Sequence, residues 1–330
     1  MCNPVHIKDY FIYDVLHNDN NELVVIAPNT QKEMTIKFNN EVLDKYNCPH
    51  GHTSIYIHKI KTQYVENIEL VVNDTIVKTK VNKYPEFKNE ILMSTLVKNE
   101  DNIILQWINF HLNIGVDRLI IYDNSDANDT FSYTSTQETS NLKELLKEYI
   151  DNGKVILINW SYPKRLNING RVSINGQTTQ QNHSIYAFQN SKYIGLFDVD
   201  EYINIQNETN IARFFEKLIK EEKINTANIG SFRLLNRFFY NPDNLPTDDY
   251  NFLHIYNCDY HTISGREKNF VLPKNVTTFS IHMITTGKPM YSIEPKKIYF
   301  NHYCYLNKAT RGRNKTNIID NSIEKHLAKY

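Results

Sequence analysis

The 330-residue sequence has no excess of either charge, because 37 lysine and arginine residues balance 37 aspartate and glutamate residues. A chain without net charge has no long-range field that attracts nucleic acid or an anionic membrane surface. We therefore expect no nucleic-acid partner. Any anionic ligand must be held by a local group of charges or by a metal ion.

Long apolar runs are also absent. No stretch reaches the roughly 18 apolar residues that a membrane-spanning helix needs. The N-terminus MCNPVHIKDYFIYDV lacks the apolar core of a secretion signal. From these two observations we expect a cytoplasmic protein without a membrane span.

Cysteines are few, and the four are scattered without a C-x-x-C pair. Neither a disulfide framework nor a cysteine-rich zinc site is indicated. The stretch Cys48-Pro49-His50-Gly51-His52 superficially resembles a metal motif, but no fourth ligand accompanies it. We interpret this stretch as a turn.

The chain divides into two segments with different hydrophobic patterns. From Glu22 to Lys83, short β-branched runs alternate with polar turn signals, which predicts a small antiparallel β module. Pro85 interrupts this alternation. We place the boundary there, with a β-rich module over residues 1–85 and a second domain over residues 86–330.

Apolar strands and amphipathic helices alternate after Pro85. The strands are ILMSTLV, RLIIYDN, KVILINW and YIGLFDVD, and the helices between them are expected at about 101–113, 142–150 and 178–189. This alternation predicts an α/β fold with a mixed, mostly parallel sheet and helices on both of its faces. Beyond Asp200 one more helix and several strand-like pieces follow, which we interpret as a subdomain that receives the acceptor.

Asp198 and Asp200 stand at the end of the fourth of these strands. Residues two apart in a strand point to the same face, so both carboxylates should project together at the edge where open parallel sheets bind ligands. Carboxylates are ligands that Mn²⁺ and Mg²⁺ prefer. A D-x-D occurs about once by chance in a chain of this length, but its place after the fourth strand, followed by Glu201, favours a metal site.

Other polar residues follow the strands. Lys98 and Glu100 come after the first strand, and Asp123 and Asn124 end the second. Such groups can contact a base, a ribose or a phosphate, but they also cap helices and turns. The run from Gln180 to His183, before the fourth strand, either touches the donor or forms an exposed helix face.

Several motifs together resemble glycosyltransferase family 92 and the related family-2-like bacterial and viral enzymes. They are LVKNEDNIILQWINFHLNIGVDRLIIYDNSD, YIGLFDVDEYI, and FNHY followed by RGR. The resemblance covers roughly residues 90–315, and its combination of K-N-E, a W-x-x-x-H helix, Y-D-N and D-V-D-E is specific. The β module carries no such motif.

The resemblance implies a GT-A fold, a nucleotide-sugar donor and a Mn²⁺ or Mg²⁺ ion at Asp198 and Asp200, and it suggests inversion at the anomeric carbon. It also implies that the first two strand ends contact the nucleoside, which here means Lys98, Glu100, Asp123 and Asn124.

A histidine from the C-terminal half commonly completes the metal site in the family. His302, in N-H-Y, is favoured, and His282 is the alternative. Basic residues after His302 are expected to grip the leaving diphosphate: Lys308, Arg311 and Arg313. The family's usual Lys-Ser pair after H-Y is replaced here by Cys304-Tyr305-Leu306-Asn307, so the contacts of this loop depart from the family pattern.

Inverting transfer needs a carboxylate that takes the proton of the acceptor hydroxyl. This base lies on the acceptor side, which we place between residues 236 and 294. Glu267 and Asp259 are the candidates. Because Glu267 stands between Arg266 and Lys268, an exposed ion pair is its alternative interpretation.

These patterns predict a metal-dependent glycosyltransferase that moves a sugar, with a UDP-sugar as the favoured donor, onto a hydroxyl of a glycan or glycoconjugate. The alternative is an inactive transferase-like domain that serves as a sugar-binding or assembly module. A phosphatase with an aspartate nucleophile is disfavoured, because its D-x-D belongs near the first strand. The β module either recognises the acceptor or mediates homo-oligomer formation.

Overall fold

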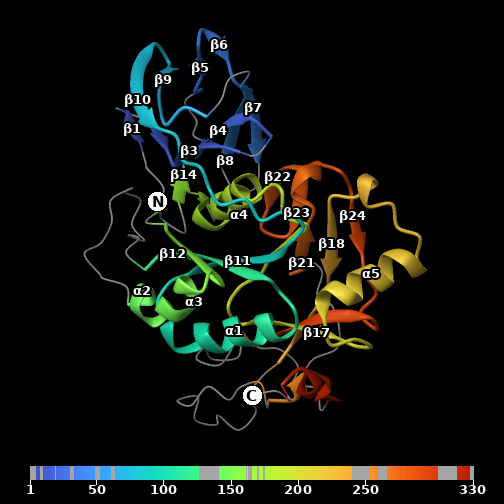
Figure 1. The fold of residues 1–330 in the computed structure, drawn as a ribbon. Helices are drawn as coiled ribbons and strands as arrows, with labels where there is room; N and C mark the ends of the chain where they lie inside the picture. The colour runs from blue at the N-terminus through green and yellow to red at the C-terminus, as the bar shows by residue number, and fades with distance from the viewer. Residues whose placement is uncertain are drawn as a thin grey trace.

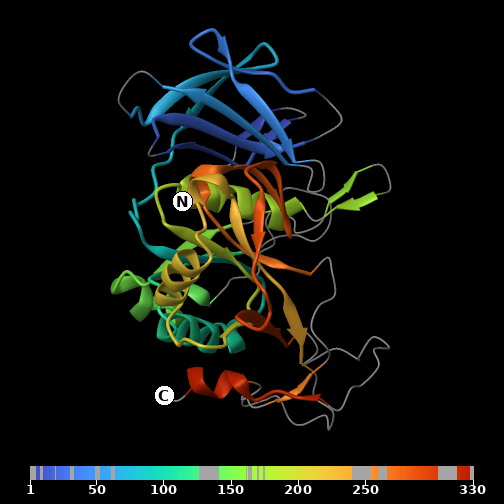
Figure 2. The same cartoon turned by 90° about the vertical axis from the view of Figure 1, so that its right-hand side faces the viewer.

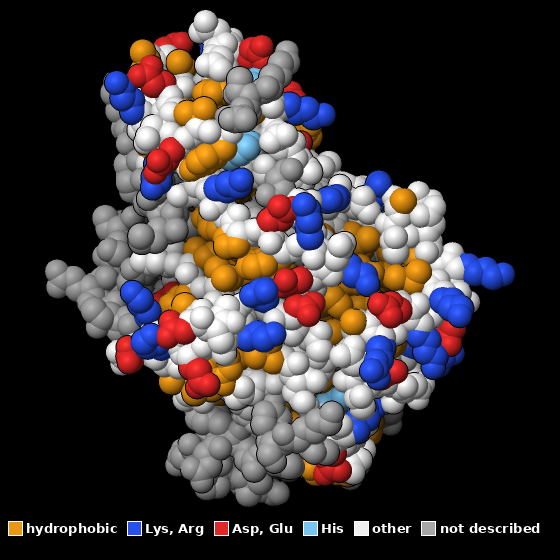
Figure 3. All heavy atoms as spheres, viewed as in Figure 1, with side chains coloured by type: hydrophobic (Ala, Val, Ile, Leu, Met, Phe, Trp, Pro, Cys, Tyr) orange, Lys and Arg blue, Asp and Glu red, His pale blue; other side chains and the backbone are white. Residues whose placement is uncertain are grey.

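A computed structural model provides the structure of the chain. It describes the following residues: 5–7, 10–18, 20–29, 33–48, 53–60, 64–125, 141–160, 162, 166–168, 171–173, 175–239, 253, 255–258, 266–303 and 318–327. Within this part of the chain, no helix is both long and apolar enough to cross a membrane. On the face shown in Figure 3, acidic and basic side chains are interspersed, in keeping with the balanced composition.

The described residues between 10 and 82, which we call the β region, form short antiparallel strands (Figure 1, blue to cyan). One four-stranded sheet has the order β3 (Asp14–His17), β4 (Glu22–Pro28), β8 (Thr53–Lys59), β7 (Asp44–Cys48). The other has the order β10 (Thr75–Lys80), β9 (Asn67–Val72), β5 (Ile36–Phe38), β6 (Glu41–Val42). Apolar side chains from both sheets form a common core. β2 (Tyr10–Ile12) pairs with β1 (Val5–Ile7).

A seven-stranded mixed sheet organises the rest of the chain. Its order is β13 (Val155–Asn159), β12 (Arg118–Asp123), β11 (Ile91–Val97), β16 (Tyr193–Leu196), β21 (Lys268–Val271), β18 (Ser231–Leu234), β24 (Met290–Ser292). The first four strands are mutually parallel, and β21 runs antiparallel to both of its neighbours. The carboxyl ends of the parallel strands therefore meet at one edge, as their apolar runs predict.

Helices cover both faces of this sheet (Figure 1). Ile91 and Met93 of β11 pack with α1, whereas Leu92 packs on the other side with α4. This division follows from the alternation of side chains along a strand. The helices are α1 (Asp101–Asn113), α2 (Leu142–Leu145), α3 (Lys147–Asp151), α4 (Asn175–Ala187) and α5 (Ile211–Glu221).

A smaller sheet lies beside the carboxyl edge of the large one. Its order is β17 (Glu201–Ile205), β25 (Ile298–His302), β19 (Asn236–Phe238). The remaining elements are β14 (Leu166–Ile168), β15 (Arg171–Ser173), β20 (Asn257–Cys258), β22 (Val276–Ser280), β23 (Met283–Gly287), β26 (Ile318–Ile319), and the short 3₁₀ helices η1 (Thr226–Asn228), η3 (Pro273–Asn275) and η4 (Ser322–His326).

Helix α1 supports β17 through the two aromatic residues of its W-x-x-x-H motif. The Trp107 indole N–H donates to the Glu201 carbonyl oxygen (3.0 Å). The His111 ring stacks on Tyr202, and its Nδ1 donates to the Trp107 carbonyl oxygen (2.8 Å). Complete burial lowers the pKa of His111 to about 3, against the opposing effect of this hydrogen bond. His111 is thus a neutral side chain of the core.

We predict that His111→Asn makes the free energy of unfolding depend less steeply on pH below pH 6.5. Above pH 6.5, the ordinary pKa of histidine, neither state protonates this residue. As the pH falls from there toward about 3, the unfolded chain binds a proton that the folded chain excludes. Stability therefore falls by up to about 1.4 kcal/mol per pH unit in this window. Urea unfolding of the parent protein and the variant at several pH values measures the free energy of unfolding. The same dependence of this free energy on pH in both proteins would contradict the prediction.

Candidate functional site

The two aspartates of D-V-D do not share one strand, contrary to the expectation from YIGLFDVD. Strand β16 ends at Leu196, and the chain turns through residues 197–200 into β17. The Glu201 amide donates to the Asp198 carbonyl oxygen (3.2 Å), and the Glu201 carboxylate accepts from the Asp198 amide (2.9 Å). These local hydrogen bonds hold a turn where a continued strand was expected. The two aspartate side chains therefore have different partners.

Asp198 is held by one cation and one amide. Its Oδ2 lies 2.7 Å from the Lys268 Nζ, and its Oδ1 accepts from the Gln177 Nε2 (2.8 Å). Lys268 Nζ also lies 3.0 Å from the Glu201 Oε2. Burial opposes the charge of Lys268, but the two carboxylates outweigh burial and raise the pKa of this ammonium group. The Asp198 carboxylate therefore keeps a fixed direction while 40% of its side chain stays exposed.

Asp200, Glu201 and His302 form the group best suited to hold a metal ion. One potential ligand atom from each lies within 4.8 Å of the other two. The His302 Nε2 is 3.5 Å from the Asp200 Oδ2, and its Nδ1 is 3.6 Å from the Glu201 Oε1. The strand pairing causes this, because Glu201 is directly opposite His302 in the antiparallel pair β17–β25. Phe238 stacks on the His302 ring from β19 (4.9 Å).

Glu201 is the most buried member of this group. Burial, opposed by the nearby Lys268 charge, raises the pKa of its carboxyl group to about 7. A divalent cation beside it would favour the carboxylate form. Two carboxylates and one imidazole are ligands that suit Mn²⁺ or Mg²⁺, and they lie close enough to share one ion. The residues present therefore fit the ion that the sequence predicts.

Two residues predicted for the metal site lie outside this group. Asp198 is engaged by Lys268 and Gln177, as described above. His282 lies in the turn between β22 and β23, where its Nδ1 donates to the Glu267 carbonyl oxygen (2.8 Å). Burial, together with the Lys268 charge, lowers the pKa of His282. His282 thus presents a neutral imidazole near Asp198 and Lys268.

The predicted nucleoside contacts lie at the carboxyl ends of β11 and β12. Lys98 and Glu100 are half-buried at the start of α1, and Asp123 accepts from the Ser125 amide (3.0 Å). Asn124 is fully buried and donates to the carbonyl oxygens of residues 160 and 162 (2.5 and 2.7 Å). Asn124 thus fixes the chain after β13, and its contact with a nucleoside stays a prediction.

The polar run Gln180 to His183 forms no exposed helix face, because all four side chains are buried in α4. Glu267, a predicted base, lies 3.8 Å from the Arg233 guanidinium and is nearly buried. The other predicted base and the diphosphate contacts lie outside the described residues: Asp259, Lys308, Arg311 and Arg313.

Two residues of the site were missed from the sequence, Gln177 and Lys268. Lys268 is the first residue of the short strand KNFV, and a lysine at such a place is a weak signal for a buried cation. Gln177 was missed because the helix was expected to begin at Thr178, whereas α4 begins at Asn175. Their partner Asp198 is distant in sequence, so only the folded chain shows the contact.

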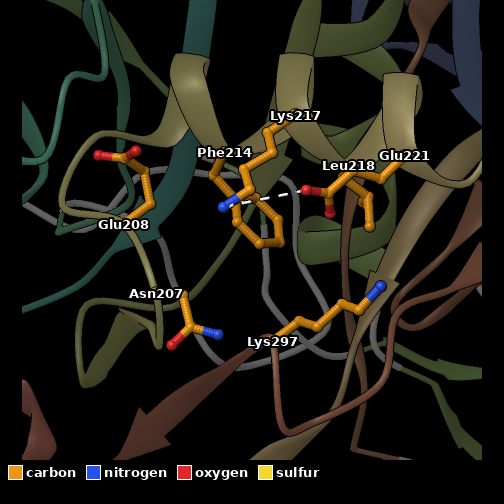
Figure 4. A pocket seen from close by; sticks show the side chains of 7 residues that line it. All are labelled: Asn207, Glu208, Phe214, Lys217, Leu218, Glu221 and Lys297. Carbon is orange, nitrogen blue, oxygen red and sulfur yellow. Dashed lines mark ion pairs between the residues drawn. The ribbon is translucent and has the colours of Figure 1, made fainter.

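The hollow shown in Figure 4 lies away from this group. Its residues Asn207 and Lys297 lie at the ends of β17 and β25 opposite to Glu201 and His302. Its volume of about 70 Å³ is well below the ~300–1,000 Å³ of typical ligand pockets. It is lined by Asn207, Glu208, Phe214, Lys217, Leu218, Glu221 and Lys297.

One family of known proteins matches most of the chain. The model of glycosyltransferase family 92 matches residues 90–329. No curated protein matches the chain. Among solved structures, the apo structure of the bifunctional glycosyltransferase WbbM is similar at 10% identity with a TM-score of 0.28, which is too low to establish a shared fold. The match covers 48% of this chain and only 26% of that one.

Proposed function

Because the chain belongs to glycosyltransferase family 92 and is a glycosyltransferase, we propose that it transfers a sugar from a nucleotide-diphosphate donor to an acceptor hydroxyl with a bound divalent cation. The proposed fold is GT-A, the proposed cation is Mn²⁺ or Mg²⁺, and the proposed outcome is inversion. The acceptor is a hydroxyl of a glycan or glycoconjugate, and a UDP-sugar is the first donor to test.

The group of Asp200, Glu201 and His302 carries this proposal. It follows the parallel strand β16 directly, at the edge where β11 and β12 also end. Ligands of open α/β sheets bind at this edge. A nucleotide diphosphate that lies along it would meet the strand ends of Lys98 and Asp123 on one side and the three metal-binding side chains on the other.

Asp200, Glu201 and His302 would hold the cation, which when bound neutralises the charge that develops on the leaving diphosphate. Asp200 is the most exposed of the three, with 30% of its side chain accessible. The His302 Nδ1 lies 3.6 Å from the Glu201 Oε1 and its Nε2 lies 3.5 Å from the Asp200 Oδ2, so the ring lies close to both carboxylates.

Asp198 would bind donor hydroxyl groups rather than the cation. Lys268 and Gln177 fix its two oxygens, and carboxylate oxygens so held retain lone pairs for further hydrogen bonds. A carboxylate in a fixed orientation accepts only from sugar hydroxyl groups that lie in matching positions. Such a site therefore discriminates among sugars by the arrangement of their hydroxyl groups.

The acceptor side of the site is proposed near His282 and Glu267. The His282 Nδ1 holds a proton, because it donates to the Glu267 carbonyl oxygen, so its Nε2 keeps a free lone pair in the neutral ring. Glu267 itself faces Arg233. Asp259 and Glu267 remain the proposed carboxylate bases.

A panel of UDP-, GDP-, TDP- and CMP-sugars tests the proposed function. Release of free nucleotide by the purified protein is measured with Mn²⁺, with Mg²⁺ and with a chelator. We expect one donor to be hydrolysed slowly, only with metal, and faster when a suitable acceptor is added. If no donor is turned over or bound under any metal condition, an inactive sugar-binding or assembly module becomes the better account.

A further inference from the structure

Helix α4 is polar in sequence but buried in the structure. Every residue from Gln177 to Ser184 is at most 8% exposed. A helix of this composition usually lies on the surface. Buried polar side chains are stable only when they are hydrogen-bonded. The partners of these side chains therefore show what the helix connects.

One set of partners belongs to the glycosyltransferase fold itself. Gln180 donates to the Ser94 hydroxyl of β11 (2.6 Å). Asn182 donates to the Phe279 carbonyl oxygen (2.7 Å) and accepts from the Phe279 amide (2.9 Å). These bonds attach α4 to the central sheet and to β22.

The other set belongs to the β region, apart from Tyr122 of β12. The hydroxyl groups of Thr179 and Thr53 lie 2.9 Å apart. His183 Nε2 lies 2.9 Å from the Asp14 Oδ2, and its Nδ1 lies 2.7 Å from the Tyr122 hydroxyl. A neutral histidine ring has one N–H donor and one acceptor nitrogen, so the ring can donate to the carboxylate through Nε2 and accept from the tyrosine at Nδ1. Both rings and the carboxylate are fully buried.

Asp14 is anchored within the β region as well. Its carboxylate accepts from the Asn82 amide (2.6 Å) and the Tyr84 hydroxyl (2.8 Å). Apolar side chains of the β region share one core with those of α4 and β12. Figures 1 and 2 both show the β region lying directly over α4. This contact is therefore a continuous part of the protein interior, not a flexible joint.

The N-terminal end of α4 contacts Asp198. Gln177 donates to the Asp198 Oδ1 and lies six residues before His183, roughly 9 Å along the helix. We propose that the β region is a brace that fixes the position of α4. In this proposal Asp14, His183 and Gln177 are positioning residues, which hold the Asp198 carboxylate in the orientation that donor binding requires. The proposal rests on the proposed function, and it assigns to the β region neither acceptor recognition nor oligomer formation.

A double-mutant cycle on donor turnover tests this chain of contacts. The variants are Gln177→Leu, Asp14→Asn and their combination, with the exposed Asp44→Asn of β7 as the matched control. We expect Gln177→Leu to lower kcat about 10- to 100-fold, an effect similar in size to the loss of a residue that orients a metal ligand, because Gln177 orients the Asp198 carboxylate. Asp14→Asn should lower kcat less, and the combination should match Gln177→Leu alone, because both act through Asp198.

A purely structural role for Asp14 would give a different result. Asp14→Asn would then lower Tm but leave the kcat of the folded enzyme unchanged, or the two effects would multiply. Either outcome overturns the proposal. If Asp14→Asn does not fold, Thr53→Val, which removes the bond to Thr179 at similar volume, takes its place in the cycle.

Amide hydrogen exchange tests the brace independently of the proposed transferase activity, because the measurement needs no sugar donor. We expect amides at the start of α4 to exchange at least about 10-fold faster in Asp14→Asn or Thr53→Val, while those of α1 keep their rate. Unchanged exchange in α4 would overturn the brace. Faster exchange in a protein that turns over no donor would leave the brace intact and reject the transferase activity.

Discussion

Asp200→Asn is expected to lower metal-dependent donor turnover at least about 100-fold while the protein stays folded. The substitution removes one negative charge from the group that would hold the cation, and loss of one group that stabilises developing charge typically costs about 10²–10³ in kcat. Asp200 is partly exposed in a turn, so its loss should change stability little. Nucleotide release with Mn²⁺ measures the activity, and the increase in Tm on adding Mn²⁺ measures cation binding.

His302→Gln should act in the same direction, because it removes another proposed ligand of the cation. Asp151→Asn, at an exposed carboxylate near the end of α3, serves as the control and should retain both activity and the Mn²⁺ effect on Tm. If Asp200→Asn keeps the metal-dependent rate of the parent protein, the cation binds elsewhere and the proposed site is wrong.

Lys268→Met is expected to lower the free energy of unfolding by about 3–5 kcal/mol. Lys268 is only 2% exposed and lies between Asp198 and Glu201. Removing one partner of a buried ion pair leaves the other charge uncompensated in a medium that solvates it poorly. Urea unfolding in the absence of metal measures the loss.

A second substitution tests the cause of this loss. Glu201→Gln in the Lys268→Met background should recover part of the stability, because it removes the buried carboxylate that the lysine had compensated. Lys217→Met removes an exposed ion pair with Glu221 and should cost less than about 1 kcal/mol. Similar losses for Lys268→Met and Lys217→Met would show that the buried charge group contributes little.

Several elements could be predicted from local patterns. The helix expected over 101–113 matches α1, and the first three apolar runs match β11, β12 and β13. Such elements depend on the periodicity of apolar residues and on continuous apolar runs, which are local in sequence. The prediction failed where the local pattern continued but the structure changed. YIGLFDVD reads as one strand, yet bonds from Glu201 turn the chain after Leu196.

Helix α4 shows why composition alone left two alternatives open for Gln180 to His183, of which the structure excludes the exposed helix face. A run of threonine, glutamine, asparagine and histidine suggests a surface face, but here each buried side chain from Gln180 to His183 finds a partner in a distant segment. Those partners come from β11, from β22 and the turn after it, and from the β region. No window of sequence contains both sides of such bonds.

The sequence alone indicated the family, the order of the strands and helices along the chain as far as β16, and the place of D-V-D at a strand end, because these depend on motifs and periodicities within short segments. Only the tertiary structure decided which side chains meet: His302 joins Asp200 through the pairing of β17 with β25, and Lys268 and Gln177 reach Asp198 from two other elements. Contacts between segments that lie about 20 to 100 residues apart depend on register and packing in space, which no local pattern encodes.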